Sequence, residues 1–280
     1  MEVVRLSTDR FQASLLGAFR SSIEHRGLIR QLAIRDVTGR YRGSFLGLAW
    51  SLFNPILMLC VYTFVFSVVF RARWGTGPTE SAVDFGLILF VGLMVHGLFA
   101  ECTNRAPGLI LGNVNLVKKV VFPLEVLPVV ALLSSMFHLV VSFVVLLAAL
   151  VLARVTLHPT ILLFPIVIAP LLLATLGVAW LLASLGVYLR DVAQTTGIIN
   201  TVLLFLSPVF YPVSALPPAF QPLFLLNPLT FIIEQAREVV IWGRLPDWSG
   251  LALYVLSSLA VAAFGFWWFQ RSRRGFADVI

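Results

Sequence analysis

The chain has 280 residues, of which 59% are hydrophobic and only 12% are charged, with a mean hydropathy of +0.96 and a net charge of +7. Soluble domains carry about 25% charged residues, so a soluble protein of this composition would expose too much apolar surface. Composition therefore predicts an integral membrane protein. The position of the basic charge then indicates topology, and nucleic acid is not an expected partner.

Residues 1–45 precede the first apolar run and are predicted to form a cytoplasmic N-terminal region without a cleavable signal peptide. In this region arginines alternate with apolar residues that share one helical face. These apolar residues are Leu28, Ile29, Leu32, Ala33 and Val37. The pattern predicts an amphipathic helix at the inner headgroup layer, with packing on a partner protein as the alternative.

The run from Gly43 to Phe70 contains no charged residue. A bilayer core needs about 20 apolar residues in helical form, so this run predicts a first span over 46–70. The complete set of predicted spans is 46–70, 85–100, 126–153, 161–189, 193–213 and 249–270. We expect an all-α integral membrane protein of one domain, 1–280, with six spans in residues 46–270 and a cytoplasmic tail over 271–280.

Basic residues set the predicted orientation, because lysine and arginine concentrate on the cytoplasmic side of membrane proteins. With the N-terminus inside, 15 of the 20 basic residues are cytoplasmic. The outer side holds Arg71, Arg73, Arg154, Arg237 and Arg244. Both termini are therefore predicted to be cytoplasmic.

The segment between the fifth and sixth predicted spans, 214–248, is rich in proline yet partly apolar. It is too polar and too short to span, so we predict a pair of short re-entrant helices. Glu234, Arg237 and Glu238 are spaced to share one helical face and form an intrahelical ion cluster. Two interpretations remain open: a structural ion cluster, or a role in gating or substrate handling.

Motifs for enzymatic chemistry are few. The only lysines, Lys118 and Lys119, follow Val117, so no Gly-Lys-Ser/Thr phosphate loop is present, and neither HExxH nor CxxC occurs. The four histidines have no metal-ligand spacing and are predicted to be structural. Cys60 and Cys102 are predicted to be ordinary buried thiols. The predicted spans contain no carboxylate, which disfavours an ion-coupled transporter.

Aromatic side chains recur in the first, second and fifth predicted spans, and Tyr62, Phe66 and Phe70 follow one i, i+4 row. Aromatic faces stack on the C–H faces of sugar rings without fixing a polymer in one register. On composition alone, interfacial belts and helix packing are the favoured explanation of the same residues.

Four blocks are similar to the membrane subunits of bacterial polysaccharide ATP-binding-cassette exporters, the type-2 permease family that moves O-antigen or teichoic acid. They are RYRGSFLGLAWSLFNP (Arg40–Pro55), VKKVVFPLEVLP (Val117–Pro128), DVAQTTGIINTVLLFLSPVFYP (Asp191–Pro212) and NPLTFIIEQAREVVIWGRLPDW (Asn227–Trp248). They occur in the family's order across nearly the whole chain.

The resemblance implies roles for particular residues. Residues 24–42 resemble the family's interface helix, and 214–245 resemble its periplasmic gate, with Glu234, Arg237 and Glu238. The loop Leu111–Phe122 resembles the coupling helix that contacts the ATPase, through Leu111, Asn113, Asn115, Lys118 and Lys119. The resemblance implies a glycan channel lined by Trp50, Phe53, Tyr62, Phe66, Phe70, Phe85, Phe90, Phe205, Phe210 and Tyr211. Arg40 and Arg42 are candidates to contact a lipid diphosphate.

The resemblance also implies a homodimer in the bacterial inner membrane, paired with two copies of a separate ATPase that binds ATP and magnesium. This chain would hold no cofactor or metal and would catalyse no bond chemistry. Its substrate would be a polysaccharide on undecaprenyl diphosphate, most simply O-antigen. The alternatives are teichoic acid or capsule export, a lipid or drug permease, a membrane glycosyltransferase, and an ATP-independent flippase.

Overall fold

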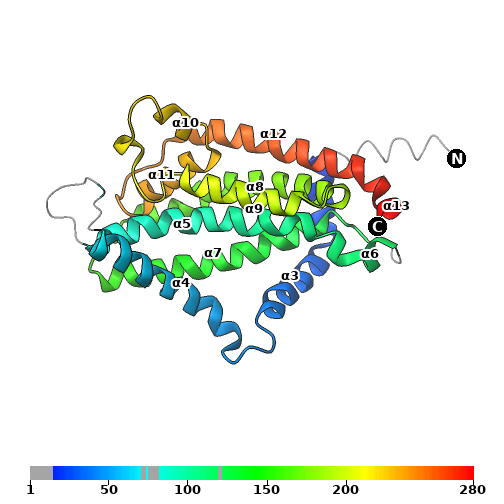
Figure 1. Cartoon of the computed structure of the whole chain (residues 1–280), viewed down its shortest axis with the longest axis horizontal. Helices are drawn as coiled ribbons and strands as arrows, with labels where there is room; N and C mark the ends of the chain where they lie inside the picture. Colours follow the sequence, from blue (N-terminus) through cyan, green and yellow to red (C-terminus); the bar gives the residue numbers. More distant parts are fainter. Residues whose placement is uncertain (1–14, 71–73, 75–81, 119–121) are drawn as a thin grey trace.

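The computed structural model describes residues 15–70, 74, 82–118 and 122–280, and within these residues the chain forms helices and turns without a strand. The long helices run side by side along one axis and form an elongated bundle (Figure 1). The all-α fold class predicted from composition is therefore confirmed for the described part of the chain.

Five helical stretches are long and apolar enough to cross a membrane: Gly47–Val69, Phe85–Gly108, Val126–Leu152, Pro159–Tyr188 and Trp248–Val279. They contain α4 (Trp50–Tyr62) with its π-helical continuation (Thr63–Val69), α5 (Ala82–Arg105), α7 (Val126–Leu152), α8 (Phe164–Tyr188) and α12 (Trp248–Ser272). The first, third, fourth and sixth predicted spans are confirmed as helices to within a few residues at their starts.

The second predicted span, 85–100, was too short. Helix α5 continues through Glu101 to Arg105, and the loop predicted to begin at Glu101 starts later. Both charges are tolerated in the helix because each has an ionic partner, Glu101 with Arg40 and Arg105 with Asp36. The prediction that no carboxylate lies within a span was therefore wrong for Glu101.

The fifth predicted span, 193–213, contains only the 14-residue helix α9 (Val192–Phe205). At 1.5 Å per residue this helix is about 21 Å long, shorter than a hydrocarbon core of about 30 Å. Pro208 explains the early end, because a proline disfavours helical geometry in the residue before it. Five of the six predicted spans therefore correspond to helices long enough to cross a bilayer, and a sixth span at α9 stays a prediction.

Two short helices, α10 (Gln221–Leu225) and α11 (Pro228–Val240), occur where the re-entrant pair was predicted. They lie at the opposite end of the bundle from α6 (Val114–Lys118) and α13 (Phe276–Val279) (Figure 1). Asn227 caps α11 by accepting a hydrogen bond from the Leu229 amide. Helix α11 then packs against α5 and α8 through its buried apolar side.

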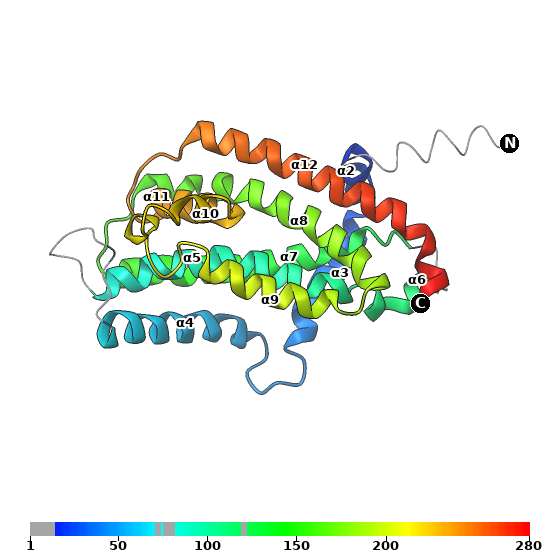
Figure 2. The ribbon, with the colours of Figure 1, turned by 45° about the horizontal axis from the view of Figure 1, so that its top comes forward.

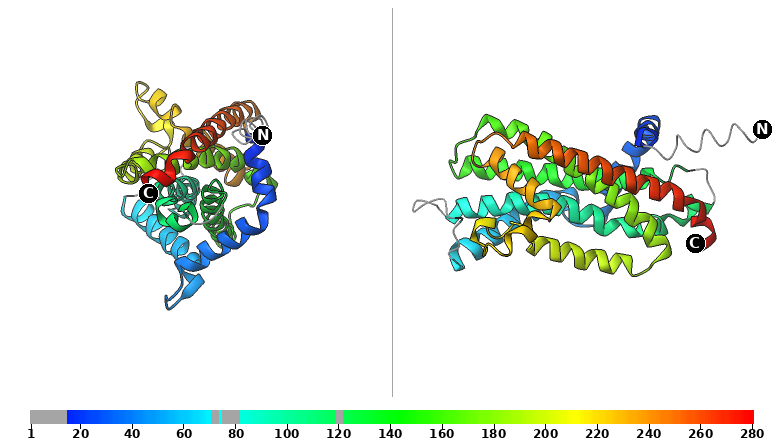
Figure 3. Two further views of the ribbon diagram at one scale, coloured as in Figure 1. Left: turned by 90° about the vertical axis from the view of Figure 1, so that its right-hand side faces the viewer. Right: turned by 90° about the horizontal axis from the view of Figure 1, so that it is seen from above.

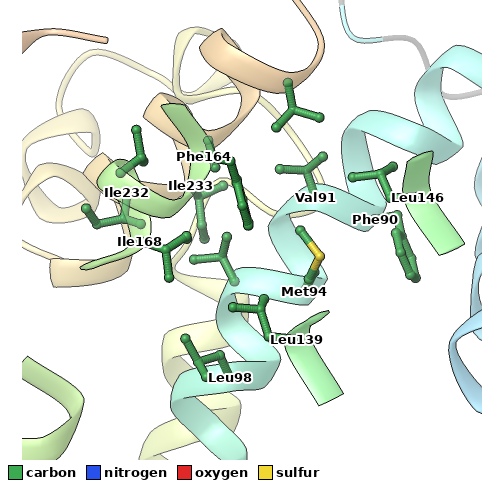
Figure 4. Packing of buried hydrophobic residues seen from close by; sticks show 14 of the residues in the cluster. Phe90, Val91, Met94, Leu98, Leu139, Leu146, Phe164, Ile168, Ile232 and Ile233 are labelled. Atoms are coloured by element: carbon green, nitrogen blue, oxygen red, sulfur yellow. The ribbon is translucent and has the colours of Figure 1, made fainter. Parts of the chain in front are cut away.

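The main core forms around α5. In the most apolar stretch of this span, 78% of the residues are buried, more than in any other described span. Phe90, Val91 and Met94 of α5 meet side chains from α7, α8 and α11 (Figure 4). In lipid, such packing is stabilised mainly by van der Waals contact, because the surrounding lipid is as apolar as the side chains. Helix α5 is therefore the central element against which the site described below is built.

Helices α8 and α12 approach each other closely at two glycines. A methyl group added at Gly177 would come within 2.6 Å of the Ala262 Cα, and one at Gly265 within 2.0 Å of the Gly177 carbonyl oxygen. Small residues at such crossings let helix backbones pack directly in membranes. This contact attaches α12, which lies at the edge of the bundle opposite α4 (Figure 2).

Helices α2 (Leu15–Glu24) and α3 (Arg26–Arg40) run around the outside of the bundle (Figure 3). Ile29 and Val37 of α3 are buried, and Ile29 packs with Val126 and Val130 of α7. The apolar face of α3 thus contacts the chain's own bundle, whereas the sequence predicted contact with lipid headgroups. Exposed apolar side chains occur on α2, at Leu16, Phe19 and Ile23, and on α3 at Ile34.

Candidate functional site: a cavity beside the first span

A cavity of about 420 Å³ lies between α4, α5 and α7, beside the end of α3. Its polar wall is formed by Arg40, Tyr41, Glu101 and His138, together with serines of α7. Its apolar wall includes Met58, Tyr62, Phe90, Leu93 and Leu204. A cavity of this size with apolar walls and a few convergent polar groups is typical of small-ligand sites.

The polar wall is an ordered network of four side chains. The Arg40 guanidinium lies 2.5 Å from Glu101, and the Nδ1 of His138 lies 2.9 Å from both carboxylate oxygens of Glu101. Because a carboxylate only accepts, Nδ1 carries a proton toward Glu101, and the other ring nitrogen, Nε2, lies within hydrogen-bond distance of the Tyr41 hydroxyl, at 2.9 Å. The network joins α3, α5 and α7.

A second ion pair lies beside this network. Arg105 donates to both carboxylate oxygens of Asp36, at 2.6 and 2.8 Å, and Ser134 donates at 2.6 Å. Burial alone would raise the pKa of Asp36, but these hydrogen bonds and the charges of Arg105 and Arg40 outweigh it and hold the pKa below its ordinary value of 3.8. This pair ties α3 to α5 and α7.

Several residues of these networks were missed from the sequence. Asp36, Tyr41 and Glu101 were given no role, and His138 was predicted to be only structural. The one available signal was the i, i+4 spacing of Asp36 and Arg40. The contacts of Arg40 with Glu101 and of Arg105 with Asp36 join residues more than 60 positions apart, which no local pattern reveals.

The predicted aromatic lining is brought together in part. Tyr62, Phe66, Phe210 and Phe205 form a continuous row of rings, with successive centroids 6.4, 5.4 and 5.6 Å apart. Of the predicted set, Tyr62 and Phe90 line the cavity. The row therefore leads away from the cavity, from the first span to the fifth predicted span.

Other predicted lining residues are placed differently. Phe85 is 1% exposed and packs between Phe66 and Trp74, so it contacts protein in this conformation. Trp50 and Phe53 pack edge to face with each other on the exposed side of the first span. The remaining two are Phe70, which packs on Phe66, and Tyr211, which donates to the Phe205 carbonyl.

Arg237 does not form the predicted cluster with its neighbours on α11. Its side chain is 1% exposed and donates to three backbone carbonyls, those of Ile88, Pro208 and Val209. The guanidinium also lies 4.3 Å from the centre of the Trp74 ring. The prediction of one shared ionic face was wrong, because Arg237 points into the core and satisfies the carbonyls where α9 has ended.

The two carboxylates of the predicted gate lie elsewhere on α11. Glu238 lies 3.6 Å from exposed Arg244, and Glu234 is half-buried. Gly92 of α5 explains how Arg237 fits, since a methyl group there would come within 2.7 Å of the guanidinium. Arg237 therefore joins α11, α5 and the end of α9.

The predicted coupling segment forms a 3-10 turn (Leu111–Asn113) followed by α6. Leu111 and Asn115 are exposed, and Asn113 donates to the Leu109 carbonyl. Lys118 ends α6, while Lys119 lies outside the described residues. Cys102 is buried as predicted, Cys60 is exposed, and both thiols are free.

A bundle of five helices long and apolar enough to cross a bilayer, among the described residues, is the architecture of a multi-span membrane protein. The chain belongs to the ABC-2 type transporter family, whose profile matches residues 27–241. This match covers well over half of the chain and includes the cavity, the coupling segment and α11.

The chain is similar over nearly its full length to named permeases. It is 30% identical over 268 residues to the O-antigen export system permease protein RfbA of Myxococcus xanthus, covering 93% of this chain and 98% of that protein. It is 23% identical to the protein of the same name from Klebsiella pneumoniae, over 88% and 92% of the two chains. The polysialic acid transport protein KpsM of Escherichia coli is 22% identical, over 83% and 90%.

Proposed function

We propose that this chain is the membrane subunit of an ATP-driven exporter that moves a polysaccharide, most simply O-antigen, out of the cytoplasm. The observation that carries the proposal is the likeness, along almost the whole chain, to permeases named for O-antigen export. The glycan would be carried on undecaprenyl diphosphate, and both termini would lie in the cytoplasm.

Two copies of the chain would form the conduit. Only 6% of the residues in the apolar window of the first span are buried within the chain. Its exposed apolar residues, called the exposed stripe below, include Leu57, Val61, Phe64 and Val68. Ile198, Val202 and Phe205 of α9 are also exposed. Large uncovered faces on two helices support pairing with a second copy, with the aromatic row between these helices available to a passing glycan.

Energy would come from a separate ATPase bound at the end that carries α6 and α13. Leu111, Asn115 and Lys118 belong to the segment at this end, and motion of the ATPase would reach the bundle through it. ATP and magnesium would bind to that partner, and this chain would position and conduct the glycan without catalysing bond chemistry.

The lipid diphosphate would bind near the end of α3. Arg40 already has Glu101 as a counter-ion, whereas Arg42 lies in a second cavity with Arg35 and Thr38, in which no acidic side chain takes part. Arginine binds phosphate oxygens in a bidentate manner. We therefore favour Arg42, assisted by Arg35, over Arg40 as the diphosphate contact.

The outer gate would be formed by α10 and α11. Arg237 would fix α11 against α5, while Glu234 and Glu238 lie on less buried positions. Movement of α11 relative to the end of α9 would open the outer end of the conduit. Because Arg237 bonds to both elements, it is the residue on which such movement depends most directly.

A second candidate substrate is a capsular polysaccharide, favoured by the likeness to KpsM, a protein named for polysialic acid transport. Teichoic acid, a lipid or a drug would require the same fold with another cargo. A glycosyltransferase would act without an ATPase, which separates it from the exporter experimentally.

The decisive experiment is purification of the tagged chain from its native membranes in mild detergent, followed by intact-complex mass spectrometry. We expect two copies of this chain with two copies of one ATPase. In parallel, deletion of the gene should abolish surface polysaccharide and leave the glycan in the cytoplasm. An active complex without any ATPase, or normal surface glycan in the deletion strain, would contradict the proposal.

A further inference from the structure

The cavity between α4, α5 and α7 has a close Arg40–Glu101 ion pair in its wall, and this pair points to a substrate class. We propose that this cavity is a binding subsite for an uncharged sugar ring and that Glu101 makes it reject acidic sugars. The inference rests on the proposed function, since it assumes that a glycan passes along this part of the chain.

Charge balance is the first step. Arg40 and Glu101 lie 2.5 Å apart, their side chains are 28% and 24% exposed, and both line the cavity. The guanidinium and the carboxylate carry opposite unit charges, so the pair has no net charge. An anionic sugar would meet the Glu101 carboxylate as soon as it reached the Arg40 guanidinium, and like charges in contact oppose binding. A neutral sugar meets no such opposition.

Hydrogen-bonding capacity is the second step. An ionised carboxylate offers about four acceptor positions and a guanidinium five donors, so the Arg40–Glu101 pair retains capacity for a ligand. His138 contacts both carboxylate oxygens of Glu101 and is itself in hydrogen-bond contact with Tyr41. Across the described residues, the cavity-lining side chains of Asn54 and Ser142 make no hydrogen bond to the protein. Sugar hydroxyl groups, which both donate and accept, match this mixture.

The shape of the opposite wall is the third step. Met58, Tyr62 and Phe90 give the cavity an apolar wall with two aromatic rings. A sugar ring has hydroxyl groups around its edge and C–H groups on its faces, so it satisfies both walls at once. Tyr62 also begins the aromatic row toward Phe210, which would receive the next rings of the polymer.

Two tetrasaccharides of equal length test the proposal: neutral cellotetraose and anionic tetragalacturonate. The complete exporter, with its ATPase, is placed in nanodiscs of zwitterionic lipid, and binding is titrated by saturation-transfer difference NMR. We expect the wild type to bind cellotetraose at least fivefold more tightly than tetragalacturonate. Glu101→Gln should reverse this preference, because Arg40 then lacks its counter-ion.

The matched control is Glu125→Gln. Glu125 is also bound by an arginine, Arg273 at 2.9 Å, but it does not line the cavity, so its replacement should leave the preference unchanged. If Glu101→Gln fails to assemble, Ser142→Lys adds a positive charge to the cavity without altering the network. It should raise the affinity for tetragalacturonate at least threefold.

Equal binding of the two tetrasaccharides to the wild type would overturn the subsite, as would equal shifts in the Glu101→Gln and Glu125→Gln variants. Export of the native glycan is measured separately in cells that carry the same complex. An exporter that moves its glycan yet shows no preference overturns the subsite alone. A complex that moves no glycan overturns the proposed function as well.

Discussion

Charged residues inside the described bundle are held by partners that lie far away in the chain. Arg237 reaches carbonyls of α5 and of the segment after α9, and Asp36 reaches Arg105. An unpaired charge or acceptor in such surroundings is strongly destabilising. Each of these contacts therefore reports on the attachment of one element to another.

Replacement of Asp36 by asparagine should loosen α3 from the bundle. The variant loses a charged hydrogen-bonded pair with Arg105, which is worth roughly 1–2 kcal/mol at a part-exposed position. Because the folded-state pKa of Asp36 is lowered, its stabilisation is present above its ordinary value of 3.8 and disappears as pH falls through the lower folded value.

The measurement is thermal unfolding of the purified complex, compared between wild type and Asp36→Asn from neutral to acidic pH. We expect a lower midpoint for the variant near neutrality and a difference that shrinks progressively as pH falls below 3.8. Glu24→Gln, which removes an exposed pair with Arg20, serves as the control. Identical midpoints of wild type and Asp36→Asn at neutral pH would contradict the prediction.

Replacement of Arg237 by methionine should destabilise the end of the bundle that carries α11. Three carbonyl acceptors lose their donor, at a cost of roughly 2–4 kcal/mol. Arg237→Lys should recover only part of this, because a lysine lacks the planar fork of donors. Thermal unfolding provides the measurement, and Arg244→Met, at an exposed arginine, should change the midpoint little. Equal effects at the two positions would show that the buried contacts are unimportant.

At the scale of helices, the sequence predicted most of the spans but not their ends. Apolar runs are long enough to identify α4, α7, α8 and α12, because hydrophobic length is a local property. The end of α5 depends on ion pairs with α3, and the end of α9 depends on Pro208 and on Arg237 from another helix. Such tertiary contacts leave no periodic signal.

The crossing of α8 and α12 should be sensitive to a single methyl-bearing side chain. Gly265→Val would place carbon atoms against the Gly177 backbone, forcing the helices apart at a cost of about 1–3 kcal/mol. Gly197→Ala on α9, where no atom lies within 4 Å of the added methyl group, is the control. Thermal unfolding of both variants is the measurement, and a wild-type midpoint for Gly265→Val would refute close packing here.

For the whole molecule, the least attached span is the first one. Figure 2 shows α4 at the edge of the bundle, and its exposed stripe has no cover within the chain. The sequence identified this helix and its aromatic residues, but it did not indicate that Glu101, His138 and the end of α3 would form a cavity beside it. The aromatic wall of the candidate site was therefore predictable, whereas its polar wall, which is built by tertiary contacts, was not.

A test of assembly follows from the exposed stripe of the first span. Two differently tagged copies of the chain, expressed together, should co-purify. Val61→Gln should reduce this co-purification at least threefold, because a polar side chain would replace an apolar contact between copies. Val144→Gln, at an exposed position on α7, is the matched control. Equal co-purification of the two variants would place the contact between copies elsewhere.

The small number of buried residues in the first span also has a consequence for the steady-state amount of this protein in a cell. If copies pair as proposed, a copy without a partner exposes a span with few buried residues, and cells degrade incompletely packed protein. The abundance of the protein should therefore follow the rate at which copies meet rather than the rate at which they are made. Overproduction would then raise turnover more than it raises the number of working exporters.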